Sequence, residues 1–293
     1  MARILIAGCG DVGTRLGLRL AACGHQVFGL RRNAGRLPPP LNGVAADLND
    51  AATLQGLPDS IEYLHYTAAA DRSDDAAYKA AYVDGLVNVL GALRTSGACL
   101  RRLLFISSTS VYGQSDGAWV DETEPTRPAS FSGRRLLEGE RTALEGAPEA
   151  VVVRFGGIYG PGRERLITRV REGAPCVADP PTYTNRIHVD DCAGVMAHLM
   201  ALPAPESVYI GVDSAPAAQC EVMDWLAGRL SVPRPPRAAP APHRQVRGNK
   251  RCRNDRLRSS GYRFQFPSYR EGYAAILATT QMGATDENRV EEN

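Results

Sequence analysis

Residues 8–13, within the stretch AGCGDVGTR, have the glycine spacing G-x-G-x-x-G. They follow the apolar run RILIA (3–7) and open a segment of helical period over 12–22. In that setting the first glycine allows a tight turn, the second lets the backbone approach a pyrophosphate, and the third lets the helix pack closely on the strand. The pattern predicts a dinucleotide-binding loop, with a bare structural turn as the alternative. The residues expected to contact the ligand are Gly8, Gly10, Asp11, Val12 and Gly13.

The end of the next apolar run, HQVFGLRRN (25–33), should decide between NAD and NADP. An acidic residue there would bind the ribose hydroxyls of NAD, but this chain has Arg31 and Arg32. Two guanidinium groups suit a ribose 2′-phosphate. NADP is therefore the predicted cofactor and NAD the less favoured one, with a solvated arginine pair as the alternative interpretation. Asp47, with Leu48 beside it, follows the expected third strand and should reach the adenine.

Further along the chain, strand-like apolar runs alternate with segments of helical period. The runs cover 3–7, 25–30, 62–66, 101–108 and 150–155, and the helical period recurs over 12–22 and 76–93. This alternation predicts an α/β fold in which a doubly wound parallel sheet is covered by helices on both faces. After residue 154 the strand-like runs shorten and the loops lengthen, which indicates a smaller C-terminal lobe.

The expected organisation is a main domain with a discontinuous lobe. A chain of 293 residues can bury one sizeable core with such an addition. Residues 1–155 form the cofactor domain, which is completed by about 184–204. Residues 156–183 and 205–282 form the substrate-facing lobe, and the polar segment 283–293 should be a disordered tail.

Composition limits the partners and the compartment. A net charge of +2 and a charged fraction of 23% give no reason to expect nucleic acid or a membrane surface as partner. The absence of a bilayer-length apolar run and of a cleavable signal pattern predicts a cytoplasmic protein. The seven cysteines lack paired metal-ligand spacing, so we expect buried thiols rather than a metal site or a disulfide framework.

Four further motifs, spread in order over nearly the whole chain, carry a resemblance to a known family. They are FISSTSVYG (105–113), RFGGIYGPG (154–162), RIHVDDCA (186–193) and NKRCRNDRLRSSGYRFQFPSYREGY (249–273). Together with the glycine motif, they resemble the short-chain dehydrogenases/reductases of the extended, NAD-dependent epimerase/dehydratase type. The resemblance implies a Rossmann-type domain that carries a small, discontinuous C-terminal substrate lobe, and it is compatible with a homodimer.

The resemblance also implies site residues. In this family a serine at the end of the fifth strand bonds the reacting oxygen of the substrate, and Ser108 falls at that position, with Ser107 beside the cofactor. The small residues Ala68 and Ala69 resemble the family's cofactor-facing turn. The serine works with a tyrosine that exchanges a proton and a lysine that holds the nicotinamide ribose. The lysine is needed because a phenol with a pKa near 10 exchanges protons poorly at neutral pH without a neighbouring cation.

The stretch SFSGRRLLEGE (130–140), where the family places these two residues, contains neither a tyrosine nor a lysine. Two registers are open: the positions hold either Phe131 and Arg135 or Ser130 and Arg134. Either arginine could bind the ribose hydroxyls, but phenylalanine carries no exchangeable proton and a serine hydroxyl is too weak an acid. The proton donors that remain open are Tyr82, Tyr112 and a bound water.

Basic residues are dense in the later part of the chain, with ten between residues 229 and 258 against one acidic residue. Such a density suits a small anionic substrate, and the nucleotide-diphosphate sugars common in this family are of that kind. The alternative is that the basic segment is a solvated surface loop that binds no substrate. Nucleic acid is disfavoured because aromatic residues are not interleaved. The residues expected at the substrate are Arg163, Arg186, Lys250 and Arg251.

The sequence therefore predicts an NADP(H)-binding oxidoreductase or epimerase/dehydratase-like enzyme. Its substrate would be small and polar, with a nucleotide sugar as one class, and its proton donor would be non-standard. The alternative is a non-catalytic NADP(H)-binding sensor or scaffold, because an intact glycine motif stands beside an altered proton-transfer site.

Overall fold

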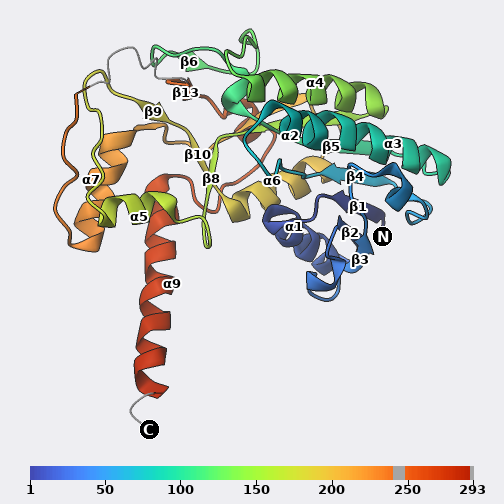
Figure 1. Cartoon of the computed structure of the whole chain (residues 1–293), viewed down its shortest axis with the longest axis horizontal. Coiled ribbons are helices and arrows are strands. Elements are labelled where there is room, and N and C mark those ends of the chain that lie inside the picture. Colours follow the sequence, from blue (N-terminus) through green and yellow to red (C-terminus); the bar gives the residue numbers. More distant parts are fainter. Residues whose placement is uncertain (240–247, 291–293) are drawn as a thin grey trace.

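The central sheet has seven parallel strands in the order β11-β7-β5-β4-β1-β2-β3. Figure 1 shows it in the computed structural model, which describes residues 1–239 and 248–290, with side chains up to residue 279. The strands are β1 (Arg3–Ala7), β2 (Gln26–Arg31), β3 (Asn42–Ala45), β4 (Tyr63–Tyr66), β5 (Arg102–Ser108), β7 (Ala150–Phe155) and β11 (Val208–Gly211). The five apolar runs predicted to be strands are confirmed to within one residue at each end.

The central strands are apolar throughout because both of their faces are covered. In β1 the consecutive residues Ile4, Leu5 and Ile6 are all fully buried. Successive side chains of a strand point to opposite faces, so continuous burial requires packing on both sides. Accordingly Ile4 and Ile6 belong to one hydrophobic core, and Leu5 belongs to a second core across the sheet.

Helices supply the two outer layers (Figure 1). One face is covered by α1 (Asp11–Ala22) and α6 (Val189–Ala201), which pack against each other. The other face is covered by α3 (Gly85–Thr95) and α4 (Phe131–Gly146), and α2 (Asp75–Lys79) packs against α4. A π-helical turn over Ala80–Asp84 joins α2 to α3. The predicted helices over 12–22 and 76–93 are confirmed, and so is the doubly wound α/β fold.

The strand order reverses between β1 and β4. After β1 the chain builds β2 and β3 on one side, then crosses to β4, β5 and β7 on the other. Loops that leave adjacent strands in opposite directions open a crevice at the carboxyl ends of the strands, which is where such sheets bind ligands. The fold therefore brings the ends of β1, β2, β4 and β5 to one site.

The later part of the chain adds a lobe beside the sheet (Figure 1). Its helices are α5 (Arg165–Arg171), α7 (Gln219–Leu230) and α9 (Tyr269–Val290), which share a core that includes Tyr159, Ile167 and Met223. Short strand pairs connect the lobe with the main domain. They are β8 (Gly157–Tyr159) with β10 (Arg186–His188), β9 (Tyr183–Thr184) with β12 (Ala217–Ala218), and β6 (Trp119–Val120) with β13 (Arg251–Cys252). The remaining elements are α8 (Asp255–Ser259) and the 3-10 turns Ala34–Arg36, Ala51–Leu54 and Thr109–Val111.

Two predicted boundaries need correction. The segment 205–282 is not all lobe, because Val208–Gly211 forms β11, whose apolar residues pair with β7 at the edge of the main sheet. The predicted tail, 283–293, is helical as far as Val290, and residues 291–293 lie outside the described part of the chain. The first turns of α9 are buried against the lobe, which offsets the cost of starting a helix, and good helix formers such as Met, Ala and Glu follow.

The cysteines also differ from the prediction. Cys176 and Cys220 form a disulfide inside the lobe, with 5.6 Å between their Cα atoms. Cys23 and Cys99 are exposed, and Cys9, Cys192 and Cys252 are the buried thiols. The expectation of buried thiols is therefore right for three of the seven and wrong for the other four. Residues 176 and 220 are 44 positions apart in sequence, so only the packing of the lobe brings them together.

Candidate functional site

The loop after β1 has the local geometry that a pyrophosphate requires. Gly8 has a φ of +79°, and a Cβ atom there would lie 2.4 Å from the Cα atom of Ala68. A Cβ atom on Gly13 would lie 2.9 Å from Oγ1 of Thr67, so a side chain would force α1 away from the sheet. Gly10 is open, since the nearest atom to a Cβ atom there is 3.8 Å away. The backbone at Gly10 can therefore be approached closely by a ligand.

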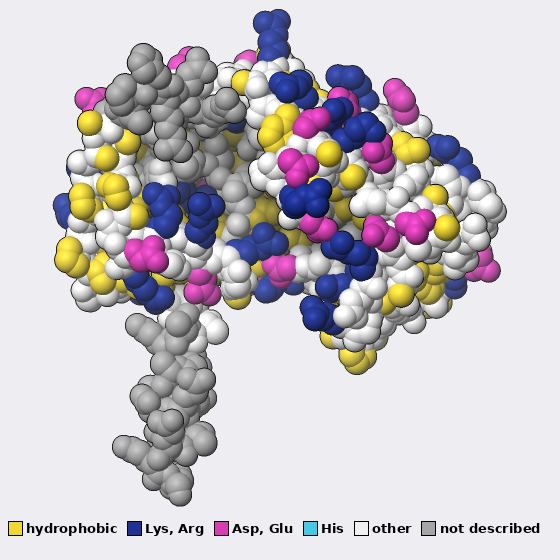
Figure 2. All heavy atoms as spheres, in the orientation of Figure 1, with side chains coloured by type: hydrophobic (Ala, Val, Ile, Leu, Met, Phe, Trp, Pro, Cys, Tyr) yellow, Lys and Arg dark blue, Asp and Glu magenta, His cyan; other side chains and the backbone are white. Residues whose placement is uncertain are grey.

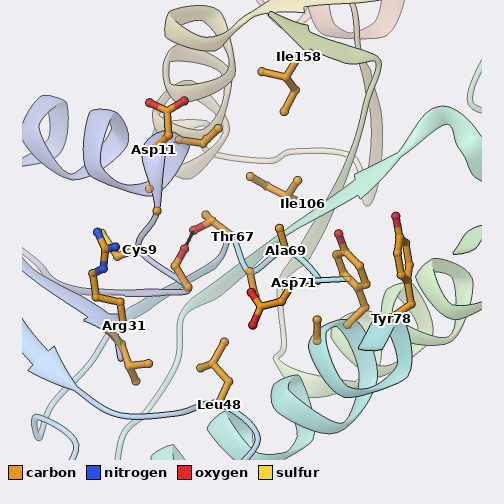
Figure 3. A pocket seen from close by; sticks show the side chains of 18 of the residues that line it. Cys9, Asp11, Arg31, Leu48, Thr67, Ala69, Asp71, Tyr78, Ile106 and Ile158 are labelled. Atoms are coloured by element: carbon orange, nitrogen blue, oxygen red, sulfur yellow. Dashed lines mark hydrogen bonds between the residues drawn. The ribbon is translucent and has the colours of Figure 1, made fainter. Parts of the chain in front are cut away.

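A cleft of about 810 Å³ opens over this loop, and we call it the sheet cleft. Figure 3 shows side chains from the ends of β1, β2 and β4 surrounding it. All of the residues predicted to contact the cofactor line this cleft. They are Gly8, Gly10, Asp11, Val12, Gly13, Arg31, Arg32, Asp47, Leu48, Ala68, Ala69 and Ser107. The structure therefore gathers residues from five separate segments of the chain around one elongated cavity.

One end of the sheet cleft is basic. Arg31 and Arg32 follow β2, and Arg36, which the sequence reasoning missed, adds a third guanidinium from the next turn. Arg32 pairs with Asp71 at 2.9 Å, but both side chains are about 65% exposed. A pair this exposed contributes roughly 0–1 kcal/mol, so an anionic ligand can displace the carboxylate.

Ser107 and Ser108 end β5 and border the middle of the cleft. The Ser107 hydroxyl donates to Oε1 of Glu140 at 2.6 Å, and Glu140 is in turn held by Arg154. The Ser108 hydroxyl accepts a hydrogen bond from the Ser110 backbone N–H at 3.1 Å, which leaves its own proton free to be donated. The structure therefore places Ser108 at the cleft, and its bond to a reacting oxygen stays a prediction.

The face of α4 that borders the cleft differs from both predicted registers. The contact between Glu140 and Ser107 fixes the rotation of the helix. Residues four apart lie on one face of a helix, so Leu136 and Ser132 continue from Glu140 toward the cleft, and both line it. The two positions facing the sheet cleft are thus 132 and 136.

Arg134 and Arg135, the residues predicted at the nicotinamide ribose, do not line the sheet cleft. Arg135 pairs with Asp75 at 2.7 Å and with Glu138 at 2.8 Å on the outer side of α4. Arg134 is exposed and donates a hydrogen bond to the backbone oxygen of Ala129. Their placement as ribose ligands is corrected, because residues 134 and 135 are turned away from the face that Glu140 fixes.

Of the two predicted phenols, only one reaches the cleft. Tyr112 is buried, and its hydroxyl accepts a hydrogen bond from Nη1 of Arg154 at 2.8 Å, outside both clefts. Burial raises the pKa of Tyr112 to about 12. Tyr82 lines the sheet cleft, and so does Tyr78, with 5.3 Å between the two ring centroids. Burial raises the pKa of Tyr82, so its phenol is protonated at neutral pH.

A second cavity, of about 640 Å³, lies between the main domain and the lobe, and we call it the lobe cleft. It contains three of the predicted substrate residues, Arg163, Arg186 and Lys250. The fourth, Arg251, does not line it. Its guanidinium lies between the rings of Trp119 and Tyr183, 4.9 and 4.6 Å from their centroids, and its Nε donates to the Gly117 backbone oxygen. Two other residues of the basic stretch, Arg244 and Arg247, lie outside the described part of the chain.

The two clefts share a border, formed by Ser108, Ser110, Gly156, Ile158 and Arg163. Sequence reasoning missed several of the polar residues in them. Arg36, Tyr78, Ser110 and Ser132 line the sheet cleft, and Arg165, Arg169 and Asn185 line the lobe cleft. A signal was present for Tyr78, which lies four positions before Tyr82 in a segment of helical period.

Among the described residues, no group of three or more His, Cys, Asp and Glu side chains is arranged to hold a metal ion. In the same part of the chain no helix combines the length and the apolar character needed to cross a membrane.

A seven-stranded parallel sheet, a glycine loop at its switch point and a small C-terminal lobe place the chain in the extended short-chain dehydrogenase/reductase class. That class includes NAD(P)-dependent epimerases, dehydratases and reductases. The chain belongs to the family described as RmlD substrate binding domain, whose model matches residues 2–205.

Comparison with known proteins gives the same class. The chain is 38% identical to a solved structure described as a putative NAD-dependent epimerase/dehydratase from Methylobacillus flagellatus, with a TM-score of 0.79 over 96% of this chain and 99% of the other. It is 32% identical to Protein YeeZ of Escherichia coli K12 over 71% of this chain and 77% of that protein. It is 28% identical to a 3-diazoavenalumate denitrifying reductase of a Streptomyces species, over 92% of this chain and 98% of that protein.

Proposed function

We propose that this protein is an NADP(H)-dependent reductase of a small polar substrate that binds in the lobe cleft. The observation that carries the proposal is the shared border of the two clefts. A ligand extended along the sheet cleft from Arg31 would end near Ser108, and a molecule in the lobe cleft would meet it there. Such an arrangement places two reactants in contact and holds them in one orientation.

The preference for NADP rests on the arginines that follow β2. Arg31, Arg32 and Arg36 all line the sheet cleft at the end where the adenosine ribose would lie. Asp71, the carboxylate beside them, is engaged by Arg32 through an exposed ion pair. A 2′-phosphate would exchange that weak pair for charge-assisted hydrogen bonds.

The site works, in this proposal, without the usual tyrosine and lysine. Ser132 and Leu136 occupy the positions on α4 that face the cleft, and a leucine cannot bind ribose hydroxyls. Bound NADPH would supply a hydride to the substrate. Ser108 would donate a hydrogen bond to the oxygen that gains electron density, and a tyrosine hydroxyl would deliver the proton to that oxygen.

Tyr82 is the proton donor in this proposal, and Tyr78 is its neighbour on the same side of the cleft. Figure 3 shows the Tyr78 ring standing at the cleft wall. Because burial raises the pKa of Tyr82, the phenol holds its proton at neutral pH, which is the form that a donor requires, and it is a weaker acid than a phenol beside a cation. This favours reduction over the reverse reaction, which would need the phenolate. Water would return the proton after turnover.

A calorimetric titration of the purified protein with NADPH, NADP, NADH and NAD tests the proposal. We expect the two phosphorylated dinucleotides to bind at least about tenfold more tightly, which corresponds to one charge-assisted hydrogen bond. A preference for NADH and NAD would overturn the cofactor assignment. If none of the four binds, the oxidoreductase proposal fails as a whole.

The second candidate is a non-catalytic NADP(H) sensor, which Leu136 favours because an apolar residue occupies a position on α4 that faces the sheet cleft and cannot bind the ribose. A protein that only binds NADP(H) should have apolar residues at the border of the two clefts. The presence there of Ser108, Ser110 and Arg163 supports the enzyme instead. Stopped-flow measurement of NADPH oxidation, with a panel of small aldehydes and ketones, separates the two candidates: a sensor oxidises NADPH with none of them.

A further inference from the structure

The lobe cleft is lined by cations and, among the described residues, by no carboxylate. Its basic residues are Arg163, Arg165, Arg169, Arg186 and Lys250, and its other polar residues are neutral. Figure 2 shows Lys and Arg side chains gathered over α5 and toward the hollow between α5 and α1. Arg163 is paired with Asp11 at 2.9 Å, and the other four cations have no ion-pair partner among the described residues. Four uncompensated cations around one cavity repel one another, so the cavity favours a negatively charged occupant.

Two of these cations are buried, which distinguishes the site from a solvated basic surface. Lys250 is 2% exposed and Arg186 is 7% exposed. Burying a cation costs several kcal/mol unless it is paired, and in the described structure neither one forms an ion pair. Among the described residues, the Lys250 ammonium donates one hydrogen bond, to the Tyr112 backbone oxygen at 3.3 Å, which leaves two of its three protons without an acceptor there.

Arg186 is likewise under-satisfied. Its Nη1 atom is buried and has no hydrogen-bond partner among the described residues, although its guanidinium contacts the Tyr273 hydroxyl. The buried carboxyl of Asp213 is nearby but does not come within ion-pair distance, and burial raises its pKa to about 7. Asp213 is therefore only partly ionised near neutral pH and does not fully compensate the charge of Arg186.

The buried pair lies beside the border of the two clefts. Lys250 is held by Tyr112, which ends the short turn Thr109–Val111 that begins next to Ser108. Ser108, Arg186 and Lys250 all line the lobe cleft, so their side chains border the same occupant. Arg165 and Arg169, by contrast, lie on α5 at the outer part of the cleft.

We propose that Lys250 and Arg186 bind a carboxylate or phosphate group of the substrate close to its reacting carbon, so that the substrate is a compact anion. This inference rests on the proposed function and adds to it the class of substrate. It differs from the expectation of a nucleotide-diphosphate sugar, whose charged groups are separated from the reacting carbon by the sugar. Arg165 and Arg169 then attract the anion and cover it without contacting its reacting end.

Isothermal calorimetry with oxalate and with UDP, on protein saturated with NADP and on protein without dinucleotide, tests the inference. Oxalate should bind at one site per chain, and Lys250→Met should weaken it at least about tenfold, the loss expected for one charge-assisted hydrogen bond. The Arg165→Ala/Arg169→Ala variant should weaken it less. Arg171→Ala is the matched control, since Arg171 lies on the same helix but not in the cleft, and it should change the affinity less than twofold.

Failure of this inference is distinguishable from failure of the proposed function. Lys250→Met should leave the affinity for NADP unchanged, and that unchanged affinity also shows that the variant folds. No oxalate binding, or equal binding by wild type and Lys250→Met, would overturn the compact anion. Tight binding of UDP without binding of oxalate would also overturn the compact anion. If Lys250→Met does not fold, a crystal of the wild-type protein soaked in oxalate decides, because oxalate must then lie within hydrogen-bond distance of Lys250 and Arg186.

Discussion

Ser132 and Leu136 lie one turn apart on the face of α4 that borders the sheet cleft, in line with the Glu140 side chain that bonds Ser107. The double variant Ser132→Tyr/Leu136→Lys should therefore present a phenol and an ammonium to the cleft. We expect it to reduce small aldehydes with NADPH at least about a hundredfold faster than the wild type, within the range contributed by a positioned general acid. The measurement is the loss of NADPH absorbance.

The matched control for this gain is Phe131→Tyr/Arg135→Lys, which introduces the same two residues one position earlier. Phe131 packs edge-on against Tyr78, and Arg135 pairs with Asp75 and Glu138 away from the cleft. This variant should show no gain. A larger rate increase in the control than in the 132/136 variant would show that the helix face has been assigned wrongly.

The arginines after β2 should determine the choice between the two dinucleotides. Replacing Arg31 and Arg32 together with alanine removes two charged donors from a 2′-phosphate, each worth about 1.5–3 kcal/mol. We expect the Kd for NADP to rise at least about tenfold while the Kd for NAD changes little. Arg94→Ala, on the exposed side of α3, serves as the control. Equal losses for NADP and NAD would refute the 2′-phosphate assignment.

The buried ion pair between Glu140 and Arg154 should make a large contribution to stability. Arg154 holds both oxygens of Glu140, at 3.0 and 2.7 Å, and both residues are less than 8% exposed. Arg154→Met would leave Glu140 as an unpaired buried charge, so we expect the free energy of unfolding to fall by about 3–5 kcal/mol. Urea denaturation measures this change.

The control variant for this loss of stability is Lys79→Met, which breaks the exposed ion pair between Lys79 and Asp84. Exposed pairs contribute about 0–1 kcal/mol, so this variant should unfold at nearly the wild-type urea concentration. The double variant Glu140→Leu/Arg154→Met should recover part of the loss, because it removes the unpaired charge along with its partner. If Arg154→Met lowers the free energy of unfolding no more than Lys79→Met does, the contacts among Ser107, Glu140 and Arg154 do not hold α4 in its orientation.

The sequence predicted the features that depend on residues close together along the chain. The glycine loop and Arg31 belong to short local segments, and the structure places both at the sheet cleft. The register of α4 could not be read, because it depends on the contact of Glu140 with Ser107, 33 positions away. The same is true of Arg163, whose Nε donates to Asp11 across 152 positions and brings the lobe to the glycine loop.

The lobe illustrates the same limit. Its basic residues were evident in the sequence, but the sequence could not say which of them face a cavity. Arg251, the first residue of β13, is held between two aromatic rings, whereas Lys250, which precedes the strand, is buried at the cleft. A count of charges predicts an anionic partner, and only the packing identifies the side chains that would bind it.

The buried carboxyl of Asp213 should make stability depend on pH. It is 1% exposed, and burial raises its pKa to about 7, whereas an aspartate in an unfolded chain has a pKa near 3.9. Between about pH 4 and pH 7 the folded protein therefore keeps a proton that the unfolded chain releases. The contribution of Asp213 to the free energy of unfolding is largest below about pH 4 and falls by at most about 4 kcal/mol as the pH rises to about 7.

Asp213→Asn keeps the hydrogen bond that Oδ1 accepts from the Ala215 backbone N–H but removes the titrating group. We expect the variant to gain stability relative to the wild type as the pH rises from 5 to 8, as measured by urea denaturation at each pH. Asp116→Asn is the matched control, because Asp116 accepts the same kind of turn hydrogen bond from Ala118 but is exposed. Should the Asp213→Asn and wild-type curves run parallel across this range, Asp213 is ionised in the folded protein. Arg186 would then be compensated by that carboxylate and would have less charge to offer an anionic substrate.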